Sequence, residues 1–164
     1  MNYLITLISV LLLMLLACEQ KESFTTIYLV RHAEKDTLFK GDNPPLIEKG
    51  LQRAERLKDI LKGEGIQRIY STKFERNINT VSPLSQELNI EVQRYDYYNY
   101  HSRMDELKNA RLTALICGHG DNLLPIIKYL NGKSPVESLG HNAYDNLFKL
   151  RISADTTFVE VIKF

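Results

Sequence analysis

The sequence is poor in cysteine, glycine and proline and has no excess of charge of either sign, and each shortage excludes a class of protein. With two cysteines in 164 residues, the chain is not a small scaffold held together by disulfides. The 21 Lys and Arg against 20 Asp and Glu provide no extended positive surface, so we expect no nucleic-acid partner. Eight glycines and five prolines exclude collagen-like and low-complexity chains. The remaining interpretation is one ordinary globular domain that recognises charged ligands through a local site.

One long apolar run is present, from Tyr3 to Ala17, and it has the length of the hydrophobic region of a signal peptide. The residues Leu15-Leu16-Ala17-Cys18 that close the run resemble the bacterial lipobox. The resemblance implies cleavage before Cys18, a diacylglyceryl group on its sulfur, and an exported protein anchored by lipid to a membrane of the bacterial cell envelope. A plain signal peptide and an uncleaved anchor helix are the alternatives.

The lipoprotein interpretation divides the chain into three segments. We expect a lipoprotein signal peptide at 1–17, a lipidated cysteine with a polar linker at 18–23, and a folded domain at 24–164. Once Cys18 carries lipid, Cys117 is left as a lone thiol. Because Cys117 ends an apolar run, we expect it to be a small buried residue and not a nucleophile.

Strand and helix patterns alternate along residues 24–164, which predicts an α/β fold with a largely parallel sheet covered by helices on both faces. In such sheets the ligand crevice lies beyond the carboxyl ends of the strands. Pro83 is expected to kink or break the second helix. The expected strands are 24–30, 66–70, 90–95, 112–117, 147–152 and 157–162, and the expected helices are 48–62, 74–88, 102–110 and 123–130.

Two arginines and two histidines follow the expected strands and should therefore meet in one crevice. Arg31 and His32 follow the first strand, Ser71 and then Arg76 follow the second, and His119 follows the fourth. Paired guanidinium groups can each donate two charge-assisted hydrogen bonds, which suits the tetrahedral dianion of a phosphoryl group. An imidazole kept neutral by nearby cations can attack phosphorus. The pattern indicates phosphoryl chemistry.

Three segments resemble the histidine phosphatase superfamily, which has the phosphoglycerate-mutase-like fold. They are Leu29-Val30-Arg31-His32-Ala33-Glu34-Lys35, Tyr70-Ser71-Thr72 followed by Arg76 and Thr80, and Cys117-Gly118-His119-Gly120, with Pro45-Leu46 and Gly50 also in place. The resemblance implies that 24–164 is a histidine phosphatase domain built as a three-layer α/β/α sandwich around a mostly parallel mixed sheet of about six strands, one of them antiparallel.

The same resemblance implies roles for single residues. His32 would be the phosphorylated nucleophile, and Arg31 and Arg76 would clamp the phosphoryl oxygens. His119 would donate to the transferring group, and Ser71 belongs to the expected substrate-binding set. The general acid would be Asp96, which stands where the family keeps its carboxylic acid after the third strand. Glu34 and Asp121 remain rivals for that role.

Departures from the family pattern narrow the expected activity. Glu34, Lys35 and Asp36 stand where longer members have extra phosphate-binding residues, which points to the small branch that includes phosphohistidine phosphatases. Ile47 stands where Thr or Ser usually caps the first helix, at an expected cost of about 1 kcal/mol of local stability. No insertion is long enough to seal a substrate in the site, so a phosphatase is favoured over a mutase. We expect a small phosphorylated substrate and neither a cofactor nor a metal.

Two other functions compete with this interpretation. A metallohydrolase could use His32, His119 and nearby carboxylates, but Arg31 and Arg76 would repel a divalent metal. A non-catalytic envelope lipoprotein could use the same fold as a binding module for a phosphate ligand. The four tyrosines between 95 and 100 could wall the pocket or simply cover the edge of the sheet.

Overall fold

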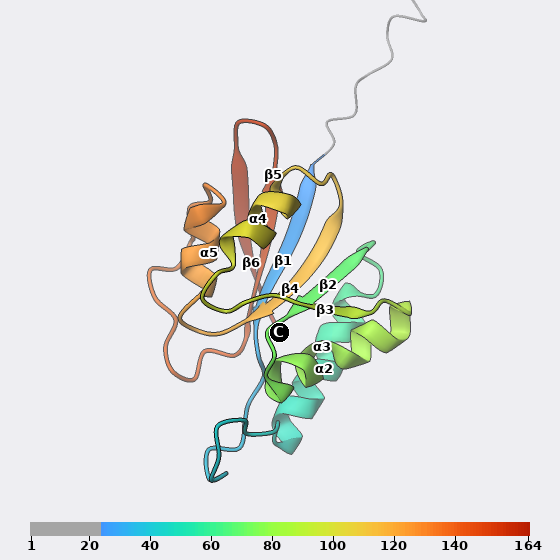
Figure 1. Cartoon of the computed structure of the whole chain (residues 1–164), viewed down its shortest axis with the longest axis vertical. Helices are drawn as coiled ribbons and strands as arrows, with labels where there is room; N and C mark the ends of the chain where they lie inside the picture. The colour runs from blue at the N-terminus through green and yellow to red at the C-terminus, as the bar shows by residue number, and fades with distance from the viewer. Residues whose placement is uncertain (1–23) are drawn as a thin grey trace, which may run out of the picture.

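A computed structural model describes residues 24–164, so the expectations for the signal peptide at 1–17, for Cys18 and for the linker at 18–23 lie outside the described residues. Within the described part, no helix is both long and apolar enough to cross a membrane. The strands are β1 (Thr25–Arg31), β2 (Arg68–Ser71), β3 (Val92–Arg94), β4 (Thr113–Gly118), β5 (Asn146–Ile152) and β6 (Thr157–Lys163). The helices are α2 (Glu48–Leu61), α3 (Glu75–Leu88), α4 (His101–Lys108) and α5 (Leu123–Tyr129) (Figure 1).

The six strands form one sheet in the order β3-β2-β4-β1-β5-β6, and five of the six run in the same direction. Only β5 is reversed, because it pairs antiparallel with both β1 and β6. The mostly parallel mixed sheet is thus confirmed. Val30 and Ser71 both lie opposite Cys117, so β1, β2 and β4 end at the same level and deliver their following residues to one edge.

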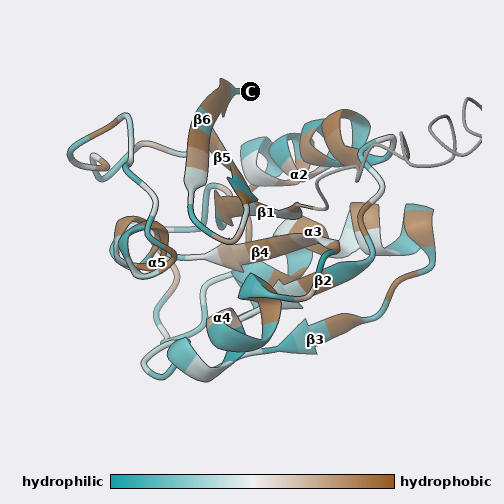
Figure 2. Ribbon diagram, turned by 90° about the horizontal axis from the view of Figure 1, so that it is seen from above, coloured by the Kyte–Doolittle hydropathy of each residue, from teal (hydrophilic) through white to brown (hydrophobic). Residues whose placement is uncertain are grey.

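Each face of the sheet is covered by a pair of helices, which confirms the three-layer α/β/α sandwich. Alternate residues of β1 point to opposite faces, as the period of a strand requires. Ile27 and Leu29 pack in the cluster that includes residues of α4 and α5, whereas Tyr28 and Val30 pack in the cluster that includes residues of α2 and α3. Figure 2 shows the hydrophobic β4 between these layers.

Two expected details differ in the structure. Helix α3 runs unbroken from Glu75 to Leu88 with Pro83 inside it. The proline removes the hydrogen bond to the carbonyl of Asn79, and Asn79 is exposed, so water can satisfy that carbonyl. Strand β3 is shorter than 90–95 because it is an edge strand that pairs with only three residues of β2.

The first turn of α2 packs directly on the backbone that follows β1. Ile47 precedes the helix without a side-chain cap, as expected, and its amide donates to the carbonyl oxygen of Glu34 at 3.0 Å. A Cβ atom at Gly50 would overlap the same oxygen, so only glycine permits this approach. The segment after β1 is thereby held in place just where the candidate site begins.

Candidate active site

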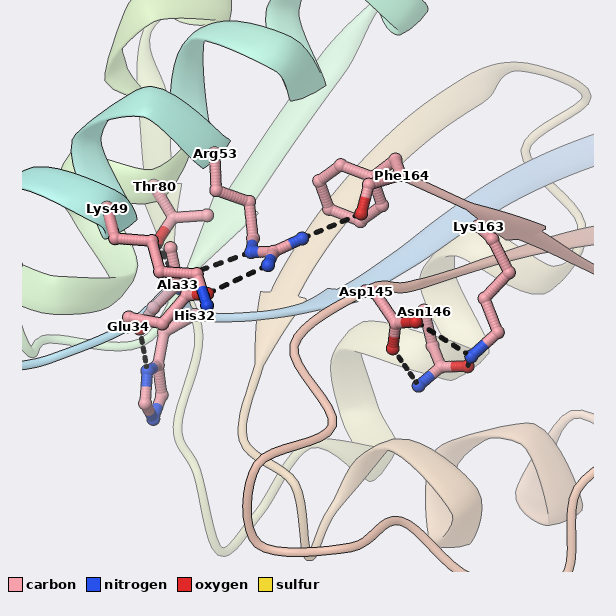
Figure 3. A network of polar contacts seen from close by, with 10 residues as sticks. All are labelled: His32, Ala33, Glu34, Lys49, Arg53, Thr80, Asp145, Asn146, Lys163 and Phe164. Carbon is pink, nitrogen blue, oxygen red and sulfur yellow. Dashed lines mark hydrogen bonds and ion pairs between the residues drawn. The ribbon is translucent and has the colours of Figure 1, made fainter.

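His32 lies directly after β1 and is 4% exposed. Its backbone amide donates to the carbonyl oxygen of Gly118 at 3.0 Å, which continues the β1–β4 pairing by one residue. The ring atom Nδ1 lies 2.8 Å from the carbonyl oxygen of Ala33. Because a carbonyl can only accept, Nδ1 carries the proton, and the lone pair of Nε2 is left free. Figure 3 shows the imidazole pointing away from Arg53.

His119 follows β4 and lies against His32. Its backbone amide donates to Oδ1 of Asn122 at 2.8 Å, and its Nε2 lies 3.0 Å from Oγ1 of Thr72. The two imidazole centroids are 5.4 Å apart in an edge-on arrangement. The structure therefore brings together the two histidines that the sequence places after separate strands.

Both imidazoles are held in the neutral form. Burial is the main cause that lowers the pKa of His32 to about 3, and the neighbouring His119, Arg76 and Arg31 lower it further, although the hydrogen bond to Ala33 acts in the opposite direction. Burial and the charges of Arg76 and Arg31 likewise lower the pKa of His119 to about 4. At neutral pH, Nε2 of His32 is therefore available as a nucleophile.

These shifts predict a loss of stability in weak acid. Each histidine has an ordinary pKa near 6.5 in the unfolded chain, so below that pH the unfolded state binds more protons than the folded state. Stability is complete above about pH 6.5 and falls as the pH drops towards the folded values. We expect each histidine to account for about 2 kcal/mol of lost stability between pH 7 and pH 5. Urea unfolding at both pH values measures this loss, and His32→Asn should show the smaller change. An equal change in both proteins would contradict the burial of a neutral His32.

Arg31 and Arg76 are each 8% exposed and carry unsatisfied donors. The guanidinium of Arg31 lies 4.2 Å from the ring centroid of Tyr144, and its Nη1 donates to the carbonyl oxygen of His141 at 2.7 Å. The guanidinium of Arg76 lies 4.3 Å from the ring centroid of Phe74. Nε of Arg31 and both Nε and Nη1 of Arg76 are buried without a partner. Buried unpaired cationic donors are costly, and an anion bound between them would satisfy them.

A cavity of about 620 Å³ opens beside His119. The hydroxyl of Tyr97 is hydrogen-bonded to Asp121, and the Tyr97 ring centroid lies 4.9 Å from that of His119. Of the four tyrosines, Tyr100 alone is absent from the lining and stacks on His101 instead. The cavity is lined by Thr72, Lys73, Phe74, Arg76, Arg94, Tyr95, Asp96, Tyr97, Tyr98, His119 and Asp121.

The three candidate acids are in different positions. Asp96 is exposed on the cavity wall, and its Oδ1 accepts the backbone amides of Tyr98 and Asn99, both at 2.8 Å. Asp121 also lines the cavity. The carboxylate of Glu34 is already paired, because Arg53 binds both of its oxygens, at 2.8 and 2.9 Å. Burial of Glu34 opposes ionisation, but these hydrogen bonds outweigh burial and hold its pKa below the usual value.

Ser71 is set back from the cavity. It is fully buried, its hydroxyl donates to the carbonyl oxygen of Thr72 at 3.0 Å, and it does not line the cavity. The neighbouring Thr72 lines the cavity and contacts His119. A strand alternates its side chains between faces, so a shift of one residue decides which hydroxyl reaches the site.

Other residues of the site were missed by sequence reasoning. Tyr144 comes from a long loop before β5 with no periodic pattern, yet it packs on Arg31 and its ring centroid lies 6.1 Å from that of His32. Asn77 donates from Nδ2 to the carbonyl oxygen of Gly118 at 2.7 Å. Its place one residue after Arg76 on α3 was the only available signal.

The segment after His32 is anchored on both sides (Figure 3). The amide of Ala33 donates to Oγ1 of Thr80 at 2.9 Å, and the side chain of Glu34 is bound by Arg53 of α2. Arg53 also donates to the carbonyl oxygen of Phe164 at 2.7 Å. These contacts hold the Ala33 carbonyl that fixes the His32 tautomer.

We expect Arg53→Met to destabilise the fold strongly, because it leaves the buried Glu34 carboxylate without its partner. The expected loss is about 3 kcal/mol or more in the free energy of unfolding, measured by urea titration. Lys49 is the matched control, since its Nζ lies 3.5 Å from the same carboxylate but its side chain is 68% exposed. Lys49→Met should cost less than about 1 kcal/mol. Equal losses in the two variants would contradict the structural role given to Arg53.

Comparison with known proteins agrees with this geometry. Residues 27–97 match the family model of the histidine phosphatase superfamily (branch 1). No curated protein matches the sequence.

Several solved structures share the fold at low sequence identity. The α-ribazole phosphatase from Shigella flexneri has a TM-score of 0.64 at 13% identity, covering 85% of this chain and 96% of its own. The protein histidine phosphatase SixA complexed with tungstate has a TM-score of 0.64 at 17% identity, covering 84% and 96%. A phosphoglycerate mutase from Bacillus anthracis has a TM-score of 0.64 at 16% identity, covering 88% and 95%. These structures show that the chain shares their fold.

Proposed function

We propose that this member of the histidine phosphatase superfamily hydrolyses small phosphate monoesters through a phosphohistidine formed on His32. One observation carries the proposal. Buried donors of Arg31 and Arg76 lack partners, and they stand beside a neutral imidazole whose Nε2 is free. Such a site is prepared for a tetrahedral oxyanion. The sequence has no insertion long enough to cover the site. This favours transfer of the phosphoryl group to water, as in a phosphatase, over its return to the substrate, as in a mutase.

The reaction would proceed in two displacements. Nε2 of His32 attacks phosphorus as the bond from phosphorus to the leaving oxygen breaks, while Arg31, Arg76 and His119 donate to the phosphoryl oxygens. Water then attacks the phosphohistidine, the bond between phosphorus and nitrogen breaks, and inorganic phosphate leaves. Nδ1 keeps its proton and donates it to the Ala33 carbonyl oxygen throughout, which stabilises the positive charge of the phosphorylated ring.

The leaving oxygen needs a proton, and we propose Asp96 as its donor, with Asp121 as the alternative, because both line the cavity. The carboxylate left by the first step then accepts the proton of the attacking water. Asp96→Asn should slow hydrolysis of an alkyl phosphate far more than hydrolysis of nitrophenyl phosphate, whose leaving group hardly needs protonation. No selective loss in that variant, together with a selective loss in Asp121→Asn, would move the role to Asp121.

Turnover of nitrophenyl phosphate by the purified chain tests the function itself. We expect hydrolysis that is unchanged by a metal chelator. Loss of activity on chelation would favour the metallohydrolase. Binding of phosphate without any turnover would favour the non-catalytic binding module.

We further propose that the chain is exported and anchored by lipid on Cys18. The support is the Leu15-Leu16-Ala17-Cys18 sequence. In a bacterial host, Cys18→Ser should move the protein from the membrane fraction to the soluble fraction while activity is kept. Retention of the variant in the membrane would favour an uncleaved anchor helix. An envelope location also favours a small-molecule ester over a cytoplasmic phosphoprotein as the substrate.

A further inference from the structure

The cavity beside His119 extends beyond the side chains that the proposed reaction uses. Its lining includes two further cations, Lys73 and Arg94, together with the rings of Tyr97 and Tyr98. Its volume of about 620 Å³ is in the range of pockets that hold whole small molecules. These additional side chains are therefore placed to contact the leaving group of the substrate.

Lys73 and Arg94 stand at the ends of neighbouring strands at one edge of the sheet. Arg94 is the last residue of β3 and pairs with Ser71, and Lys73 comes two residues after Ser71. His32 follows β1, which lies two strands further in from β2. With about 4.8 Å between neighbouring strands, the backbone near Lys73 is displaced from the nucleophile by roughly 10 Å across the sheet, and that of Arg94, one strand further out, by roughly 14 Å.

The ring of Phe74 links Lys73 to the phosphoryl site. The guanidinium of Arg76 lies 4.3 Å from its centroid, and Nζ of Lys73 lies 5.8 Å from the same centroid. Because both cations lie over one ring, they are at most about 10 Å apart. An anion bound by Lys73 would thus be within one small molecule's length of an anion bound by Arg76.

The acidic residues that line the cavity do not pair with Lys73 or Arg94. Among residues 24–164, no ion pair includes Lys73 or Arg94. Asp96 and Asp121 would repel an anion, but each carboxylate already accepts a hydrogen bond from neighbouring protein groups. Oδ1 of Asp96 accepts two backbone amides, and Asp121 accepts the Tyr97 hydroxyl. Cations without a partner beside an open cavity favour an anionic ligand.

We propose that Lys73 and Arg94 form a second anion-binding subsite. The preferred substrates are then phosphate monoesters whose leaving group carries its own carboxylate or phosphate within roughly 10 Å of the reacting phosphorus. Tyr97 and Phe74 provide the aromatic wall between the two anions, which suits a ring in the body of the leaving group. This inference rests on the proposed phosphatase activity of the site that adjoins the cavity at Arg76 and His119.

A matched pair of substrates tests the subsite with the full-length chain. The first is 4-(carboxymethyl)phenyl phosphate, and the second is the corresponding amide, which has nearly the same shape but no second charge. At low salt we expect kcat/KM to be at least about fivefold higher for the carboxylate, and high salt should reduce this advantage. A third ester with a phosphonomethyl group in place of the carboxymethyl group shows which anion the subsite prefers.

Variants assign the effect to the two side chains. Lys73→Met and Arg94→Met should each bring the ratio of kcat/KM between the carboxylate and the amide close to one. The control is Arg68→Met, because Arg68 is an exposed cation at the opposite end of β2, outside the cavity. This control should keep the wild-type ratio.

The outcomes separate the subsite from the phosphatase proposal. Hydrolysis of the amide at a rate equal to or above that of the two anionic esters would overturn the subsite and leave the phosphatase activity standing. A preference for the anionic esters that survives in both Lys73→Met and Arg94→Met would also overturn it. Failure to hydrolyse any of the three esters would overturn the proposed function, and the subsite with it.

Discussion

Replacing His32 with alanine should abolish turnover, with a loss of at least about 10⁴-fold in kcat. The physical reason is that His32 supplies the protein atom that would bond to phosphorus in the first displacement. The structure leaves its Nε2 free and neutral, since Nδ1 is bound to Ala33 and the pKa is lowered to about 3. Steady-state hydrolysis of nitrophenyl phosphate measures the loss.

His101→Ala is the matched control for the His32 variant. His101 is exposed at the start of α4, where it stacks on Tyr100 outside the cavity. It should keep wild-type turnover. The His32 variant should also remain folded at neutral pH, as circular dichroism and thermal unfolding can establish. Turnover within tenfold of wild type in folded His32→Ala would contradict nucleophilic catalysis at this residue.

Replacing Arg76 with alanine should lower kcat by roughly a hundredfold to a thousandfold, the usual effect of removing a prepared donor from an oxyanion site. Its Nε and Nη1 are buried without partners, so they are available to the phosphoryl oxygens, where charge is greatest in the transition state. Arg76→Lys should recover only part of the loss, because a single ammonium cannot reproduce the two directed donors of the guanidinium.

The Arg76 variant also separates function from stability. A buried guanidinium with unpaired donors destabilises the empty protein, so Arg76→Ala should unfold at the same or a higher temperature than wild type. Inorganic phosphate should raise the unfolding temperature of wild type and have a smaller effect on the variant. A variant with near-normal kcat, or one that loses activity only because it unfolds, would contradict the role given to Arg76.

Much of the fold could be predicted from the sequence because its signals are local. The apolar β-branched segments define the central strands, and alternation with helices implies the parallel sheet and its two covered faces. Pro83 was misleading because a helix tolerates proline when the carbonyl freed four residues earlier faces water, and the exposure of Asn79 depends on tertiary packing.

Only the site residues that lie at the ends of strands could be predicted from the sequence. Arg31 ends β1, and His32 and His119 directly follow β1 and β4, so parallel pairing alone brings them together. The acid could not be assigned, because the choice depends on contacts between distant segments. Arg53, which is 19 residues away in sequence, pairs with Glu34 and makes it a poorer candidate for the acid. No local pattern could indicate that Tyr144, in the loop before β5, reaches Arg31.

Trapping the covalent intermediate tests the central claim most directly. Wild-type protein would be mixed briefly with a phosphate ester labelled with ³²P and quenched in alkali, since phosphohistidine survives base and is lost in acid. We expect label on the peptide that contains His32. The label should be lost on acid treatment, and His32→Ala should carry none. Rapid turnover with no label in wild type, or label that is stable to acid on another residue, would contradict a phosphohistidine at His32.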